Sequence, residues 1–153
     1  MSEVQEPRGS FTFIGGEIDL DLKPPPTLES FYQFCGQRKL MGVRCESCEA
    51  VLLPPRMLCP RCGSSNSEWV ELKGTGELLT YSVIHVAPAT FQPLVPYAVG
   101  IVALAEGARL PGIIRVRPED LRVGLELKIA FEPSTSKNWP SWPRYFFVRA
   151  DTP

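Results

Sequence analysis

Two CxxC pairs within the stretch CESCEAVLLPPRMLCPRC, residues 45–62, constrain the fold more than any other feature of this sequence. Cys45 and Cys48 form the first pair, Cys59 and Cys62 form the second, and ten residues separate the pairs. A gap of two residues lets a tight turn aim both sulfurs of a pair at one ion, and four thiolates suit a tetrahedral metal. Gly63 follows the second pair, where a left-handed backbone is useful. The stretch therefore predicts a zinc-ribbon metal site.

The donor set also indicates what the metal does. Four protein ligands complete the shell of a tetrahedral zinc ion, so no position remains for a substrate or an activated water. We therefore expect a structural zinc ion that stabilises a ribbon with little apolar core of its own. Iron in the same cage, as in an electron carrier of the rubredoxin type, is the alternative that the spacing leaves open.

Composition narrows the classes of protein that fit. The chain has 153 residues, enough for one domain or a small domain with an appendage, and 44% of them are hydrophobic. Its 16 prolines are about twice the usual share and disfavour long helices. The net charge of −1 excludes a strongly basic nucleic-acid binder. Residues 109–149 nevertheless carry eight basic and four acidic side chains, which is compatible with a phosphate-bearing ligand.

The N-terminus predicts the compartment. MSEVQEPRGSFTF has no basic start followed by an apolar run, so we expect no signal peptide. No stretch approaches the length of a membrane span, and we expect no membrane partner. Without export, CxxC pairs indicate metal or redox cysteines in a reducing compartment, which here is the cytoplasm.

The pattern along the chain divides it into four segments. Residues 1–26 are predicted to form an extended acidic arm that ends in three prolines, and residues 27–39 a short docking helix. Leu28, Phe31 and Cys35 recur at helical spacing, Thr27 is the expected N-cap and Gly36 the expected stop. Residues 40–70 are predicted to form the zinc ribbon, and residues 71–153 a barrel.

The barrel prediction depends on alternating runs that Gly and Pro interrupt. These runs occupy residues 76–86, 97–106, 109–117, 125–131 and 144–150. Five short strands with such turns are typical of an OB-fold barrel. The sequence therefore predicts a mainly β chain, with an N-terminal helix and a rubredoxin-like zinc ribbon followed by a five-stranded OB-fold barrel.

Cys35 and His85 are the candidates for catalysis outside the ribbon. A functional interpretation makes Cys35 a nucleophile that the only histidine activates. The structural interpretation, which we favour, places Cys35 on the buried face of the short helix and His85 at a strand end. No metalloprotease, nucleophile-elbow, phosphate-loop or dinucleotide motif is present. The sequence thus does not require an enzyme.

Aromatic and basic residues near the C-terminus are candidates for binding. Trp139 and Trp142 in NWPSWPRYFF are either a stacking platform for single-stranded nucleic acid or a contact with a partner protein, and the balanced charge favours the partner. Arg115 and Arg117, which we expect on one face of their strand, are candidates for pairing with phosphates or carboxylates. An exposed strand face is the simpler explanation for both arginines.

The order of these segments and two local motifs resemble a known family. The sequence FYQFCGQRKLMGVRCESCEAVLLPPRMLCPRCGS, with PPR before the second pair, is followed by a tryptophan and then by GTGELLTYSVIHV. Over residues 27–150 this resembles the zinc-ribbon/OB-fold family called domain of unknown function 35, whose members accompany thiolases.

The resemblance implies a non-catalytic accessory subunit. Similar proteins bind acyl-CoA enzymes, such as thiolase with hydroxymethylglutaryl-CoA synthase, acyltransferases, and the hydratase and aldolase systems of steroid degradation. It implies that the ribbon and helix dock on the partner, and that the barrel helps enclose the path of acyl-CoA and its pantetheine arm. It implies metal ligation by Cys45, Cys48, Cys59 and Cys62, and no catalytic residue. A nucleic-acid-binding OB protein, a rubredoxin-like electron carrier and a thiol enzyme are the alternatives.

Overall fold

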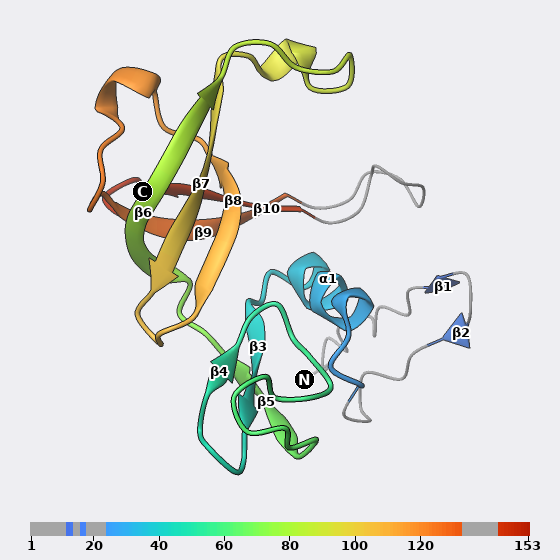
Figure 1. Ribbon diagram of the computed structural model, residues 1–153. Coiled ribbons are helices and arrows are strands. Elements are labelled where there is room, and N and C mark those ends of the chain that lie inside the picture. The colour runs from blue at the N-terminus through green and yellow to red at the C-terminus, as the bar shows by residue number, and fades with distance from the viewer. Residues whose placement is uncertain (1–11, 14–15, 18–23, 133–143) are drawn as a thin grey trace, which may run out of the picture.

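The computed structural model describes residues 12–13, 16–17, 24–132 and 144–153 (Figure 1). At the N-terminus, the two-residue strands β1 (Thr12–Phe13) and β2 (Gly16–Glu17) pair antiparallel. The rest comprises one helix, a three-stranded sheet and a closed five-stranded barrel. Mostly β structure, with a single α-helix and an OB-like barrel after the ribbon, confirms the fold class that the sequence predicts.

Helix α1 (Leu28–Gly36) begins where the sequence predicts. The hydroxyl of Thr27 accepts a hydrogen bond from the backbone N–H of Ser30 at 3.3 Å, which satisfies one of the free donors of the first turn. The prediction that the helix stops at Gly36 is confirmed, because Gly36 is the last helical residue and Gln37 is the C-cap. Arg38 adopts the left-handed conformation, with φ of 60°, where the chain turns toward the ribbon.

The ribbon consists of a sheet in the order β4-β3-β5 and the loops that carry the cysteines. Strand β3 (Met41–Cys45) pairs antiparallel with β4 (Val51–Leu52) on one side and with β5 (Ser67–Glu71) on the other. Trp69 of β5 packs edge-on against Phe34 of α1, with ring centroids 5.0 Å apart, and its indole N–H donates to the carbonyl of Pro24 at 2.6 Å. Trp69 thus fixes the helix and the entering chain against the ribbon.

The barrel strands are β6 (Thr75–Ile84), β7 (Tyr97–Leu104), β8 (Arg109–Ile114), β9 (Glu126–Glu132) and β10 (Arg144–Arg149). They close in the order β10-β8-β7-β6-β9, and every pairing is antiparallel except β10 with β8. Short 3₁₀ helices occupy the β6–β7 and β8–β9 connections, at Gln92–Leu94 and Pro118–Asp120. Figure 1 shows the β6–β7 hairpin extending away from the ribbon.

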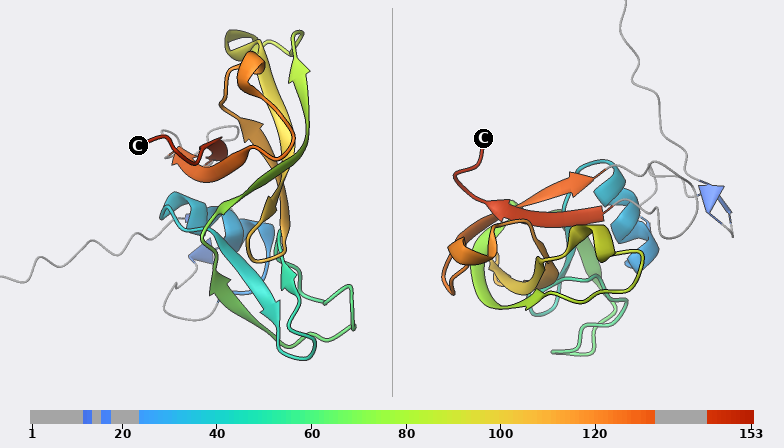
Figure 2. Two further views of the ribbon diagram at one scale, coloured as in Figure 1. Left: turned by 90° about the vertical axis from the view of Figure 1, so that its left-hand side faces the viewer. Right: turned by 90° about the horizontal axis from the view of Figure 1, so that it is seen from above.

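One core runs through the barrel and under the helix. Phe147, Leu78 and Leu127 are fully buried inside the barrel. Phe31 and Cys35 of α1 join the same cluster, together with Leu40 and Leu72, which lie side by side at one end of the ribbon sheet. The ring of Phe31 meets that of Tyr145 edge-on at 5.9 Å, which connects α1 to β10. The helix therefore covers one end of the barrel and joins it to the ribbon (Figure 2).

Close packing explains the two glycines of the GTG motif at the start of β6. A Cβ atom on Gly76 would lie 2.1 Å from the carbonyl oxygen of Ala103, because β6 and β7 approach each other closely there. A Cβ atom on Gly74, whose φ is +72°, would lie 2.2 Å from a methyl carbon of Ile129. Both positions therefore require glycine where the chain passes from the ribbon into the barrel.

No helix among the described residues has the length and apolar character needed to cross a bilayer.

Candidate metal centre

Two tight turns of the same design hold the four cysteines. In the first, the N–H of Cys45 donates to the carbonyl of Ala50, and the N–H of Glu49 donates back to the carbonyl of Cys45, both at 2.9 Å. In the second, the N–H of Cys59 donates to the carbonyl of Ser64 at 2.9 Å, and the N–H of Gly63 donates to the carbonyl of Cys59 at 2.8 Å. The two turns thus repeat one hydrogen-bonding pattern. We refer to them as the first and second knuckles, residues 45–50 and 59–64.

The residue after each CxxC pair is left-handed. Gly63 has φ of 75°, as the sequence predicts, and its equivalent in the first knuckle is Glu49 with φ of 60°. A residue with a side chain is strained in this region by roughly 1–2 kcal/mol. The first knuckle therefore has an unfavourable backbone conformation that the second avoids.

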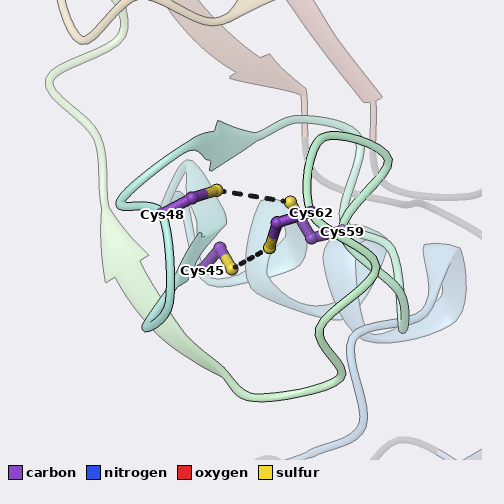
Figure 3. Close-up of side chains that lie close together, drawn as sticks. All are labelled: Cys45, Cys48, Cys59 and Cys62. Atoms are coloured by element: carbon purple, nitrogen blue, oxygen red, sulfur yellow. Dashed lines mark hydrogen bonds between the residues drawn. The ribbon is translucent and has the colours of Figure 1, made fainter.

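The four sulfurs converge on one point (Figure 3). The Sγ atoms of Cys45 and Cys62 are 3.6 Å apart, those of Cys48 and Cys59 are also 3.6 Å apart, and all four lie within 4.8 Å of one another. Sulfurs at about 2.3 Å from a tetrahedral zinc ion are about 3.8 Å from each other, so the cluster has the size of such a shell. The donor set and its geometry therefore fit a closed Cys₄ metal site.

Backbone N–H groups lower the pKa of two of the four thiols. The N–H groups of Cys48 and Ser47 donate to the sulfur of Cys45 and lower its pKa to about 6. The N–H groups of Cys62 and Arg61 likewise lower the pKa of Cys59. Such donors favour thiolates, which are the form that binds metal.

Crowding among the sulfurs opposes the ionisation of Cys62. The N–H of Ser64 lowers its pKa, but the hydrogen bond with the sulfur of Cys45, burial, and the sulfurs of Cys48 and Cys59 together raise that pKa to about 12. Four thiolates this close repel one another, so one sulfur retains its proton unless a positive ion lies among them. A divalent metal removes this conflict and lets all four ionise.

The fifth cysteine is separate from this site. Cys35 is 1% exposed on the core side of α1, and burial raises the pKa of its thiol to about 12. His85 is exposed just beyond the end of β6, at the far end of the hairpin from α1 (Figure 1). The structural interpretation of Cys35 as a small buried apolar residue is confirmed. A protonated, enclosed thiol that is remote from the histidine is not an activated nucleophile.

The arginine candidates lie elsewhere than predicted. Strand β8 ends at Ile114, so the expectation that Arg115 and Arg117 share a strand face is wrong. The chain leaves β7 after Ile114 and turns toward the 3₁₀ segment at Pro118. Arg115 pairs with Glu132 at 2.9 Å and lies 3.6 Å from the ring centroid of Phe146. Arg117 pairs with Asp120 at 2.8 Å. The tryptophan candidates, Trp139 and Trp142, lie outside the described residues.

The outer face of the barrel carries a groove that was not predicted from the sequence. The groove has a volume of about 440 Å³ and crosses strands β6, β7 and β8. Its lining residues are apolar or small, and none is charged: Thr80, Val99, Gly100, Ile101, Pro111, Gly112 and Ile113. The signal in the sequence is YAVGIVAL, which is apolar at every position and so leaves apolar side chains on both faces of its strand.

This architecture, a four-sulfur ribbon followed by a five-stranded barrel, is that of a zinc-ribbon/OB-fold protein. Family models match both parts: "ChsH2, rubredoxin-like zinc ribbon domain" over residues 33–68 and "ChsH2, C-terminal OB-fold domain" over residues 69–132. A "DUF35 domain-containing scaffold protein" of Methanocaldococcus jannaschii is 43% identical over 94 residues, which cover 60% of this chain and 67% of that one. The chain belongs to the ChsH2 family, also called DUF35.

Two further relatives carry the names of enzymes. A "probable enoyl-CoA hydratase alpha subunit" of Thermomonospora curvata is 34% identical over 110 residues, which cover 68% of this chain but only 34% of that protein. A solved structure described as "Ltp2-ChsH2(DUF35) aldolase" is 30% identical with a TM-score of 0.68, over 80% of this chain and 93% of the matched one. The resemblance to domain of unknown function 35 is therefore confirmed.

Proposed function

We propose that this chain is a non-catalytic scaffold subunit of an acyl-CoA enzyme complex. The observation that carries the proposal is the nature of its site. The cluster of metal-ligating side chains in the described part of the chain is a closed set of four sulfurs, in a family with relatives named scaffold proteins. A closed site organises the polypeptide and offers no position to a substrate.

The enzyme names of two relatives are compatible with a scaffold. The chain corresponds to about a third of the enoyl-CoA hydratase subunit, so most of that protein lies outside the shared part. The description of the solved structure, "Ltp2-ChsH2(DUF35) aldolase", names ChsH2 together with Ltp2, so the word aldolase is not attached to ChsH2 alone. In this proposal, the catalytic groups of the present complex belong to the partner enzyme.

The proposed metal is zinc, bound by Cys45, Cys48, Cys59 and Cys62. Zinc accepts a tetrahedral sulfur shell without a redox change, and its bound state contributes to folding. Its chemistry here is electrostatic: it neutralises the thiolates and closes the ribbon. Iron in the same cage would make the chain an electron carrier, an alternative that metal analysis decides.

The proposed partner is a thiolase or thiolase-like enzyme, with hydroxymethylglutaryl-CoA synthase as a further member of such a complex. The ribbon and α1 dock on the partner, and the barrel helps enclose the path of the CoA arm between active sites. Arg115, Arg117, Trp139 and Trp142 are the candidate contacts for CoA or the partner. Arg117 is the better placed arginine for a phosphate, since its side chain is 75% exposed despite its pairing.

A nucleic-acid-binding function has less support. OB-folds bind single strands on the face of their second and third strands, which here are β7 and β8. The groove on that face is lined by Val99, Ile101 and Ile113 among others, and its lining includes no lysine or arginine. A phosphate backbone requires such cations, so this surface fits an uncharged partner better.

Affinity purification of the full chain from its own cells tests the proposal. We expect an acyl-CoA enzyme of the thiolase type to co-purify, about one zinc per chain, and no turnover by the isolated chain. Cys35→Ala is the matched control, because a scaffold with this substitution supports the same turnover in the complex. Recovery of nucleic acid, of red iron-loaded protein, or of no acyl-CoA enzyme would contradict the proposal.

A further inference from the structure

Two adjacent apolar side chains are exposed at the end of the ribbon. Met57 is 63% exposed and Leu58 is 62% exposed, in the loop that joins β4 to the second knuckle. Single exposed apolar residues are ordinary, and Val86 and Val123 are examples on the barrel side. Two consecutive ones are a larger apolar surface in contact with water. Figure 2 shows the loops of the ribbon projecting at the end of the molecule opposite the barrel.

The loop presents these side chains from a fixed backbone. Pro55 is buried two residues before Met57, and Cys59 is buried immediately after Leu58, at 4% exposure. Cys59 is also held by the hydrogen bonds of the second knuckle. A loop fixed on both sides loses little conformational entropy when it binds a partner, so more of the contact energy appears as affinity.

Arginines stand on either side of the apolar pair. Arg56 and Arg61 are exposed, and neither forms an ion pair with the residues that the structure describes. Arg44 in the same ribbon differs, since it pairs with Glu68. Free guanidinium groups beside an apolar surface favour a partner with carboxylates around an apolar depression.

The charge balance argues against a membrane surface as the partner. Anionic bilayers attract clusters of about four to eight basic residues. The end of the ribbon has two arginines, and the facing first knuckle carries the exposed acidic residues Glu46 and Glu49. Methionine and arginine are both enriched in protein interfaces, which agrees with a protein partner.

We infer that Arg56, Met57, Leu58 and Arg61, here called the ribbon tip, bind the partner acyl-CoA enzyme directly. Met57 and Leu58 enter a shallow apolar depression on that enzyme, and the two arginines pair with carboxylates at its rim. This inference rests on the proposed function and adds to it the contact and the chemistry of the surface that receives it.

Paired substitutions test the ribbon tip. The chain with Met57→Ser and Leu58→Ser is compared with one carrying Val86→Ser and Val123→Ser, which removes two apolar side chains from elsewhere that are at least as exposed. Both are purified from the source cells, with metal content measured on each. We expect the tip variant to retain at least about tenfold less acyl-CoA enzyme, with its metal unchanged, and the control to retain as much as wild type.

Photo-crosslinking locates the contact without destabilising substitutions. A benzophenone amino acid at position 57 is expected to crosslink to an acyl-CoA enzyme, at a peptide that contains apolar and acidic residues. The same group at position 123 is expected to leave that peptide uncrosslinked. This arm remains informative if the serine variant fails to fold.

The outcomes separate the two claims. An enzyme that binds wild type and tip variant equally, and crosslinks at neither position, overturns the ribbon tip and leaves the proposed function standing. A wild-type chain that recovers no acyl-CoA enzyme overturns both. Flotation of the chain with phosphatidylcholine–phosphatidylserine vesicles that Met57→Ser abolishes would show that the tip binds membranes, and this also overturns the inference.

Discussion

The ribbon and the barrel differ in what fills their interiors. The barrel encloses a cluster of large aliphatic and aromatic side chains, with Leu78, Leu127 and Phe147 fully buried. In the ribbon, apart from Gly42 and Pro55, the buried residues outside that shared cluster are Val43, Cys45 and Cys59. Two of these three are candidate metal ligands. The barrel is therefore stabilised by apolar burial, whereas we expect the ribbon to depend on the metal that we propose for its cysteines.

Because of this difference, we expect the barrel to be sensitive to core truncation and the ribbon to be sensitive to loss of metal. A domain stabilised by apolar burial keeps its stability when a chelator is added, and loses stability when a core side chain is truncated. A metal-stabilised ribbon tolerates few changes at its ligands and is lost when the metal leaves. The ribbon tip that we propose for docking lies in the metal-dependent part, so we expect partner binding to be lost when the metal is removed.

Removal of the metal is expected to have the largest effect. Chelation, or the double substitution Cys45→Ser and Cys59→Ser, removes a site that can contribute about 10 kcal/mol to a small metal-bound fold. We expect hydrogen exchange to increase across residues 41–72 while residues 97–114 remain protected. Cys35→Ala is the control and leaves the ribbon protected. Equal loss of protection in both regions would show that the barrel depends on the metal too.

Truncation of a core side chain in the barrel is expected to have the second largest effect on stability. Phe147→Ala removes a fully buried ring that packs against Tyr145 at 6.2 Å, and should lower the free energy of unfolding by about 3–5 kcal/mol. Val43→Ala in the ribbon should cost less, about 1–2 kcal/mol, because the metal carries most of the stability there. Denaturant unfolding of the metal-loaded chains measures both. Similar costs would contradict the contrast between the two interiors.

Alkaline pH distinguishes Cys35 from the ribbon cysteines. Burial raises the pKa of its thiol from 9.0 to about 12, so the unfolded chain releases this proton at a lower pH than the folded chain. The associated stability is complete below about pH 9 and is lost as the pH rises toward 12, at up to about 1.4 kcal/mol per pH unit. Unfolding free energy should therefore fall less steeply in Cys35→Ala than in wild type between about pH 9 and 10.5. Parallel curves would mean that the thiol is not buried in this way.

Left-handed positions give the smallest expected effects. Gly63→Ala strains the second knuckle and should weaken metal binding by about 1 kcal/mol, roughly fivefold. Glu49→Gly relieves the backbone strain of the first knuckle and should strengthen metal binding by about 0.5–1 kcal/mol. Metal affinity by competition with a chelator measures both variants.

A barrel turn offers the matched control for these glycine substitutions. Gly107→Ala introduces the same kind of strain in the turn between β7 and β8, at φ of +91° with no neighbour within 4 Å. It should lower the stability of the barrel and leave metal affinity unchanged. An effect of Gly107→Ala on metal binding would show that the two parts are coupled more tightly than their interiors indicate.

The sequence predicted the architecture because its signals are local. CxxC spacing determines where pairs of sulfurs point, and alternation with Gly and Pro marks strands, so the sulfur cluster and the five barrel strands followed from neighbouring residues. The N-cap at Thr27 is equally local. These features did not require knowledge of the tertiary structure.

Long-range packing explains what the sequence did not predict. The contact of α1 with the end of the barrel depends on Phe31 meeting Tyr145, which are far apart in the sequence. The end of β8 before Arg115 depends on its crossing to β10, where the N–H of Arg115 donates to the carbonyl of Phe147 at 2.8 Å. The exposure of Met57 and Leu58 also had no signal in the pattern, because an apolar pair beside a metal site is as compatible with burial as with docking.

We infer that the metal proposed for the four cysteines keeps the docking surface of the ribbon folded. Native mass spectrometry of the affinity-purified complex, recorded before and after chelation, tests this inference. We expect a mass for the acyl-CoA enzyme with this chain and about one zinc per chain. We also expect zinc and the enzyme to be lost together while the barrel of the chain stays folded. A complex that stays intact after its metal has gone would contradict the claim.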